Sequence, residues 1–267
     1  MNEKQVALVL SGGSALGLAH IGVIQVLQEA GYSFDAIYGV SAGAIIGAAL
    51  ADGMSGEEIE EEFFNTNLVE LGWDLSRVSA GLIRGGRIRN FFNEFFNARD
   101  IEELEIPLSI GATDFISGEY LALSTGNIAD ALRASISLPL IFEPYKHPDF
   151  DNHLVDGGLT NNLPIADAIE NYPGEHIIAI NVHPLYPYAE RIKKRSVFGF
   201  KKDIQSILRH SFNIMMNAQT MHISDERISY IVPKLERFSM RSFKRSDQEN
   251  LIEAGREAAR ELLKELI

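Results

Sequence analysis

Residues 36–50, AIYGVSAGAIIGAAL, decide the fold. The first five of them form a short apolar run, which is typical of a buried β-strand. After Ser41 nearly every residue is small or apolar, which indicates a helix packed closely against other backbone. Ser41 stands between Gly39 and Gly43, where the expected strand ends and the expected helix begins. The stretch therefore predicts a strand, a sharp turn and a buried helix in direct succession.

The residues before this stretch predict a second strand and helix. Residues 5–10 are a continuous apolar run that ends at Ser11-Gly12-Gly13, as expected of a strand buried on both faces. Residues 15–30 carry apolar side chains at helical spacing, and Gly31 follows as a helix-ending glycine. Strand, helix and strand with short connections form a βαβ unit. The sheet is therefore expected to be at least partly parallel and covered by helices.

The rest of the chain also alternates between expected strands and helices. It contains no repeat and no linker long enough to separate two domains. We expect one α/β domain over residues 1–267. Its further elements are a hairpin of strands at 107–115 and 119–124, a helix at 129–135, strands at 153–155 and 177–182, a helix at 204–223, a strand at 227–232, and a C-terminal helix capped by Ser246 with Glu249.

Composition excludes several classes of function. The chain has 37 acidic and 24 basic side chains, a net charge of −13, so it would repel nucleic acid. It has no cysteine, which removes disulfides, thiolate metal sites and thiol nucleophiles. The N-terminus offers no signal-peptide core, and no apolar stretch approaches the roughly 20 residues of a membrane span. We therefore expect a soluble cytoplasmic protein without nucleic-acid partners.

The pattern from Gly39 to Gly43, G-x-S-x-G, fits a nucleophile elbow. In an elbow the glycines allow a sharp turn from strand to helix, and the serine hydroxyl stands exposed at the helix N-terminus. The alternative is a tight turn of small residues without chemistry. The strand-turn-helix context favours Ser41 as a nucleophile.

A glycine-rich loop, Ser11-Gly12-Gly13-Ser14, follows the first expected strand. Free backbone N–H groups at the start of a helix can bind a phosphate or the oxyanion of an attacked ester. A dinucleotide site is disfavoured because Ser14 occupies the position of a required glycine, and because Asp35 precedes the second strand instead of ending it. The loop is therefore a candidate oxyanion hole.

A serine nucleophile needs a base, and two kinds of residue compete for this role. None of the seven histidines lies in a metal-binding motif. His183 could serve a Ser-acid-His triad, but only one strand and one helix precede Ser41, unlike an α/β-hydrolase; His20 is expected to be structural. Asp156, in Asp156-Gly157-Gly158 at the end of a short strand, is the carboxylate that stands out. By itself Asp-Gly-Gly is an ordinary turn.

The glycine-rich loop, G-x-S-x-G and D-G-G together resemble the patatin-like phospholipase family. The likeness extends to residues 135–139 (SISLP), 142–144 (FEP), 161–164 (NNLP) and 251–255 (LIEAG), so it covers nearly the whole chain. It implies a three-layer α/β/α sandwich with a mostly parallel central sheet, and a Ser-Asp dyad that needs neither metal nor cofactor.

By the matching positions, the resemblance implies that Ser41 is the nucleophile and Asp156 the general base. Oxyanion donors would come from Gly12, Gly13 and Ser14. The implied substrate is a lipid or another carboxylic ester, cleaved through an acyl-enzyme. Two alternatives stay open: an acyltransferase that passes the acyl group to an alcohol or lysolipid, and a catalytically weak lipid-binding module.

The loop departs from the family pattern at two positions. Ser14 replaces a third glycine, which keeps an N–H but adds a hydroxymethyl group. Leu16 replaces a basic residue, and the loss of this charge predicts a weaker preference for phosphorylated head groups. Replacing Leu16 with arginine is then expected to shift activity towards phospholipids.

Two segments are candidates for lipid contact. Phe91, Phe92, Phe95 and Phe96 lie at helical spacing and form either a lid over an acyl groove or part of the core, with the core favoured. Residues 184–210 hold seven basic and two acidic side chains in an otherwise acidic chain. That segment either docks on an anionic membrane or is a solvated loop.

Overall fold

The fold is described from a computed structural model of the chain. It describes residues 4–66, 83–183, 215–216, 223–238, 242 and 244–265. The basic segment at 184–210 and nearly all of the helix expected at 204–223 lie outside these ranges. In the described part of the chain no helix is both long enough and apolar enough to cross a membrane.

Within the described residues, eight strands form one mixed, mostly parallel sheet in the order β5-β6-β3-β2-β1-β7-β8, with β4 paired to β3. The parallel strands are β1 (Lys4–Leu10), β2 (Tyr32–Val40), β3 (Leu108–Asp114), β7 (Ile177–Ile180) and β8 (Ile228–Ile231). The antiparallel strands are β4 (Tyr120–Leu123), β5 (Tyr145–Lys146) and β6 (His153–Asp156).

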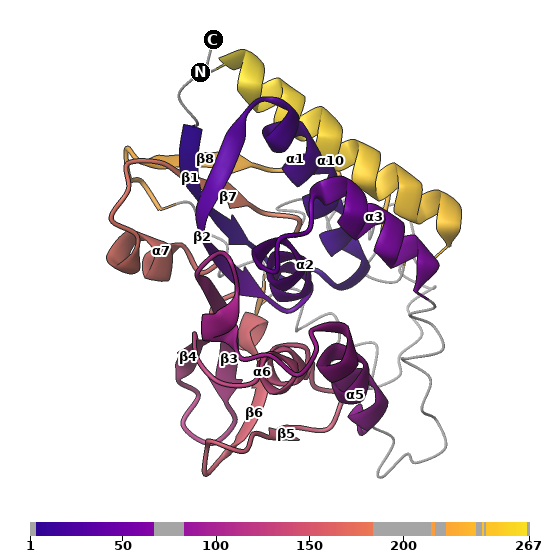
Figure 1. Ribbon diagram of the computed structural model, residues 1–267, viewed down its shortest axis with the longest axis vertical. Coiled ribbons are helices and arrows are strands. Elements are labelled where there is room, and N and C mark those ends of the chain that lie inside the picture. Colours follow the sequence, from indigo (N-terminus) through magenta and orange to yellow (C-terminus); the bar gives the residue numbers. More distant parts are fainter. Residues whose placement is uncertain are drawn as a thin grey trace, which may run out of the picture.

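Helices cover both faces of this sheet, which gives the expected three layers (Figure 1). One face carries α1, α2 and α10, and the other carries α7. The α-helices are α1 (Leu18–Glu29), α2 (Ala42–Ala51), α3 (Gly56–Asn65), α5 (Gly86–Phe95), α6 (Ile128–Ser135), α7 (Ile165–Asn171) and α10 (Arg245–Glu265); 3-10 turns are η1 (Ser14–Gly17), η3 (Ile101–Glu103) and η4 (Gly157–Leu159).

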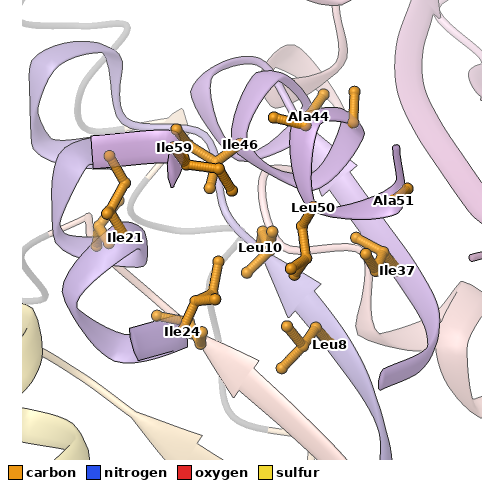
Figure 2. Close-up of a cluster of buried hydrophobic side chains, with 14 of the residues drawn as sticks. Leu8, Leu10, Ile21, Ile24, Ile37, Ala44, Ile46, Leu50, Ala51 and Ile59 are labelled. Atoms are coloured by element: carbon orange, nitrogen blue, oxygen red, sulfur yellow. The ribbon is translucent and has the colours of Figure 1, made fainter. Parts of the chain in front are cut away.

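Alternate residues of β1 supply the two hydrophobic cores. Leu8 and Leu10 point towards α1 and α2, where they join the cluster shown in Figure 2. Ala7 and Val9 point to the opposite face and pack in the cluster that includes α7. Because successive side chains of a strand face opposite ways, an unbroken apolar run is what a strand between two helical layers requires.

Most expected elements are confirmed, and several details differ. Strand β5 and helix α7 were not expected, and β2 begins at Tyr32, so Asp35 lies within this strand instead of before it. The expected helix at 15–30 begins with the 3-10 turn η1 before α1. The C-terminal helix does not use Ser246 as its cap: it begins at Arg245, and the N–H groups of Asp247 and Gln248 donate to the Lys244 carbonyl. The sequence does contain a capping box elsewhere, Ser55 with Glu58, which starts the unexpected helix α3.

The phenylalanines of α5 contribute to the core. Phe92 and Phe96 are buried, and Phe91 and Phe95 pack against the same cluster. The guanidinium of Arg89 makes a two-pronged hydrogen bond to Asp130 of α6, which fixes the two helices side by side. The core interpretation of these aromatic residues is therefore confirmed.

Candidate active site

The register of the sheet brings Ser41 and Asp156 to the same level. Val40 of β2 pairs with Gly111 of β3, so Ser41 follows β2 at the height of Ala112. On the other side of β3, Ala112 pairs with Asp156 of β6. The two candidate residues therefore flank one position of β3, each one strand spacing of about 4.8 Å away.

Ser41 has the backbone of a sharp elbow. Its φ of 53° and ψ of −118° are unusual for a residue with a side chain, and it directly precedes α2. A Cβ on Gly43 would lie 2.3 Å from the Leu10 carbonyl oxygen, and one on Gly39 would lie 2.8 Å from the Gly43 carbonyl oxygen. The elbow can therefore form only with glycine at both positions. Ser41 stays partly exposed.

Asp156 is a buried carboxylate close to Ser41. It is 1% exposed, and its Oδ1 accepts a hydrogen bond of 2.8 Å from the Gly158 N–H. Burial raises the pKa of Asp156 to about 6, and the Gly158 N–H and the Ser41 side chain, which favour the charged carboxylate, oppose the rise only in part. The pair joins a hydroxyl to a carboxylate that is more basic than usual.

The glycine-rich loop lies against this pair. A Cβ on Gly12 would lie 2.5 Å from Asn162 Oδ1 and 3.3 Å from Ser41 Cβ, which leaves no room for a side chain there. The Gly12 N–H donates to the Asn162 carbonyl at 3.1 Å, so it is already used within the protein. The Gly13 N–H has no acceptor among the described residues. The absence of a side chain at Gly12 thus lets the loop approach Ser41, whereas Gly13 offers its backbone N–H as a hydrogen-bond donor.

Two side chains that the sequence analysis did not single out support the site. Asn162 is fully buried, and its Nδ2 donates to the Gly12 carbonyl at 3.4 Å. Ser135 is also fully buried, and its Oγ accepts from the Ser41 N–H at 2.8 Å. Both belong to segments that carried the family resemblance, SISLP and NNLP, and this membership was their only signal in the sequence.

His20 and His183, the described histidines nearest the glycine-rich loop, are both buried and hydrogen-bonded within the protein. His20 is fully buried, and its Nε2 lies 2.9 Å from the Ser11 carbonyl oxygen. Burial lowers the pKa of His20 to about 4, which keeps the ring neutral and confirms its structural interpretation. The backbone N–H of His183 donates to Asn181 Oδ1. In the described ranges no three histidine or carboxylate side chains gather as they would around a metal ion.

Comparison with known proteins assigns the family. The sequence pattern of the patatin-like phospholipase family matches residues 8–169, more than half of the chain. The chain belongs to this family. The match includes Ser41, Asp156 and the glycine-rich loop.

Relatives and solved structures agree with this family. An uncharacterized NTE family protein of Mycobacterium bovis is 31% identical over 97% of this chain and 46% of its own length. Neuropathy target esterase sws of Drosophila melanogaster is 32% identical over 68% of this chain and 13% of its own length. The chain thus spans about half, or less, of the curated relatives it matches. VipD of Legionella pneumophila shares the fold, with a TM-score of 0.68, 17% identity, and coverage of 99% of this chain and 67% of that one.

The two departures from the patatin pattern differ in their surroundings. Ser14 has a φ of 52°, a left-handed conformation that glycine adopts without strain, which explains the glycine usual in the family. Leu16 is 1% exposed and packs in the hydrophobic core. The prediction that position 16 reads the head group is therefore wrong, because its side chain points into the core and an arginine there would bury a charge.

Replacing Asp156 with asparagine is expected to stabilise the fold at neutral pH. The folded pKa, about 6, lies above the ordinary value of 3.8, so folding favours the protonated carboxyl. This contribution is fully present below about pH 4 and is lost as the pH rises through 6, when the buried charge costs on the order of 3 kcal/mol. Urea unfolding should show a variant more stable than the parent at pH 7, with the difference shrinking towards pH 4. A difference that grows at low pH would contradict the raised pKa.

Proposed function

We propose that this chain is a serine acyl hydrolase, with residues 1–267 forming one catalytic domain, that cleaves lipid or other carboxylic esters. The observation that carries the proposal is the partly exposed Ser41 on a strained elbow, placed by the sheet register at the height of the buried carboxylate of Asp156. Membership of the patatin-like phospholipase family supports a lipid substrate.

In the first half of the reaction, Ser41 Oγ attacks the acyl carbonyl carbon. Asp156 accepts the hydroxyl proton as the new C–O bond forms, then returns it to the ester oxygen as the bond between the acyl carbon and that oxygen breaks, so the alcohol leaves and an acyl-enzyme remains. A carboxylate with a pKa of about 6 is suited to this task, because it is mostly ionised at pH 7 yet more basic than an ordinary aspartate.

Backbone amides stabilise the tetrahedral oxyanion. We assign this role to the Gly13 and Ser14 N–H groups and to the N–H of Ala42, the first residue of α2. Among the described residues neither Gly13 nor Ala42 has an acceptor for its N–H. Ala42 directly follows Ser41, and Gly13 directly follows Gly12, which lies against Ser41. Donors fixed before the reaction stabilise developing charge without reorganisation, and the N-terminal end of α2 adds its dipole.

In the second half, water attacks the acyl-enzyme with Asp156 again as base, and the carboxylic acid is released. The same intermediate would transfer its acyl group if an alcohol or lysolipid replaced water. The acyltransferase alternative therefore differs only in the second acceptor, and the partly exposed Ser41 leaves both acceptors a route to the intermediate.

Product analysis tests the proposal. The wild-type protein and a Ser41→Ala control are incubated with a panel of acyl esters, with and without added glycerol as acceptor, and products are identified by mass spectrometry. We expect free carboxylic acid from the wild type alone. Acyl-glycerol as the main product would make the protein a transferase, and lipid binding without any turnover would reduce it to a binding module and contradict the proposal.

A further inference from the structure

The end of β2 breaks the regular hydrogen-bond ladder with β3. In this parallel pair Ile37 lies opposite Leu108, and the Ile37 N–H donates to the Pro107 carbonyl at 2.9 Å. The ladder repeats every two residues. Four residues further on, the N–H of Ser41 would donate directly to the carbonyl of Gly111.

The hydroxyl of Ser135 occupies the place of that direct bond. The Ser41 N–H donates to Ser135 Oγ at 2.8 Å, and Ser135 Oγ–H donates to the Gly111 carbonyl oxygen at 2.6 Å. The direction of both bonds is fixed, because an amide N–H can only donate and a carbonyl can only accept. One hydroxyl is thus inserted between the two strands at the point where Ser41 leaves the sheet.

This insertion solves a problem that the elbow creates. With φ of 53° and ψ of −118°, Ser41 turns away from the strand path, so its N–H loses the partner that a straight strand would supply. A buried amide left without an acceptor destabilises the fold. Ser135 is the last residue of α6, which packs beside β3 (Figure 1). From there its fully buried hydroxyl reaches both β3 and the Ser41 amide at the end of β2.

The hydrogen bonds through Ser135 fix Ser41 to the same part of β3 that pairs with Asp156. Gly111, the acceptor, precedes Ala112, and Ala112 is the β3 residue opposite Asp156. A shift of the Ser41 backbone relative to Gly111 is therefore also a shift relative to Asp156. A displacement of about 1 Å between reacting groups can cost a hundredfold in rate.

We propose that Ser135 is a positioning residue for the nucleophile: its hydroxyl, inserted into the β2–β3 ladder, holds the Ser41 elbow at the height of Asp156. The catalytic consequence rests on the proposed function of Ser41. Ser135 itself does not contact substrate; it acts through the Ser41 amide and the Gly111 carbonyl.

Ser135→Ala removes the inserted hydroxyl and is expected to lower kcat 10- to 100-fold with KM changed less than threefold. The matched control is Ser137→Ala. Ser137 lies just beyond the same end of α6 and is equally buried, but within the described ranges its hydroxyl bonds only to Arg133, by accepting from the guanidinium and donating to the carbonyl. Ser135→Thr keeps a hydroxyl and is expected to recover at least a third of the wild-type kcat.

The experiment measures kcat and KM on a short soluble ester, thermal unfolding, and hydrogen exchange of the Ser41 amide by NMR for all four proteins. Support requires that Ser41 exchange accelerates at least tenfold in Ser135→Ala but not in Ser137→Ala, together with the selective loss of kcat. An unchanged Ser41 exchange rate in Ser135→Ala, or equal losses of kcat in both alanine variants, would overturn the inference.

The exchange measurement also separates this inference from the proposed function. If the wild type turns over no ester, the proposed function fails, while the exchange rates still decide whether Ser135 holds the elbow. If Ser135→Ala does not fold, Ser135→Thr carries the test: with its retained hydroxyl, Ser41 must exchange as slowly as in the wild type, and faster exchange contradicts the proposal.

Discussion

Replacing Ser41 with alanine is expected to lower ester turnover at least about a thousandfold, because it removes the hydroxyl on which the proposed acyl-enzyme forms. Asp156→Asn should cause a loss of similar size, since the amide cannot accept the Ser41 proton. The double variant should be no worse than either single one, because members of one catalytic unit are strongly non-additive. The measurement is kcat on one soluble ester for the four proteins, with circular dichroism to confirm folding.

His183→Gln is the control for this comparison. A histidine triad would lose as much activity in this variant as in Asp156→Asn, whereas a Ser-Asp dyad should retain a substantial fraction. Wild-type turnover by Asp156→Asn would remove Asp156 from the mechanism. Loss of activity in a folded His183→Gln protein would restore the histidine triad.

The value of kcat/KM is expected to fall about tenfold for each pH unit below 6. Asp156 acts as a base only when ionised, and its pKa in the free protein is about 6, so activity is present above that pH and is lost as the pH falls through it. An aspartate with an ordinary pKa of 3.8 would instead remain active down to about pH 4. Initial rates between pH 4 and 8 on a soluble ester give the profile.

Because histidine also titrates near pH 6.5, the profile is compared between variants. The inflection near pH 6 should persist in His183→Gln and be absent from the residual activity of Asp156→Asn. A profile that is flat through pH 6, or an inflection that disappears only in the histidine variant, is incompatible with Asp156 as the base.

Local sequence patterns predicted much of the fold and the turn at Ser41, whereas the role of Asp156 as base was implied by the family resemblance and stays a prediction. The strand, elbow and helix around Ser41 are encoded within about fifteen neighbouring residues, and so is the β3–β4 hairpin. Helix α3 was missed because its sequence, GEEIEEEFFN, carries few apolar residues, although Ser55 and Glu58 marked its start.

The supporting parts of the site could not be predicted, because they depend on long-range register. Ser135 meets the Ser41 amide across 94 residues, and the Asn162 side chain meets Gly12 across 150 residues. At Leu16 the motif was misleading. Its position in the motif suggested an influence on the head group of the substrate, whereas packing directs the side chain into the core.

The account is tested most directly by searching for the acyl-enzyme. The wild-type protein is mixed with excess p-nitrophenyl butyrate, quenched with acid within milliseconds to seconds, digested and analysed by mass spectrometry. We predict that the peptide containing Ser41 gains the mass of one butyryl group, that Ser41→Ala gains none, and that Asp156→Asn gains it at least a thousandfold more slowly. Ester hydrolysis by the wild type with the butyryl group on another residue, or undiminished hydrolysis by Ser41→Ala, would contradict it.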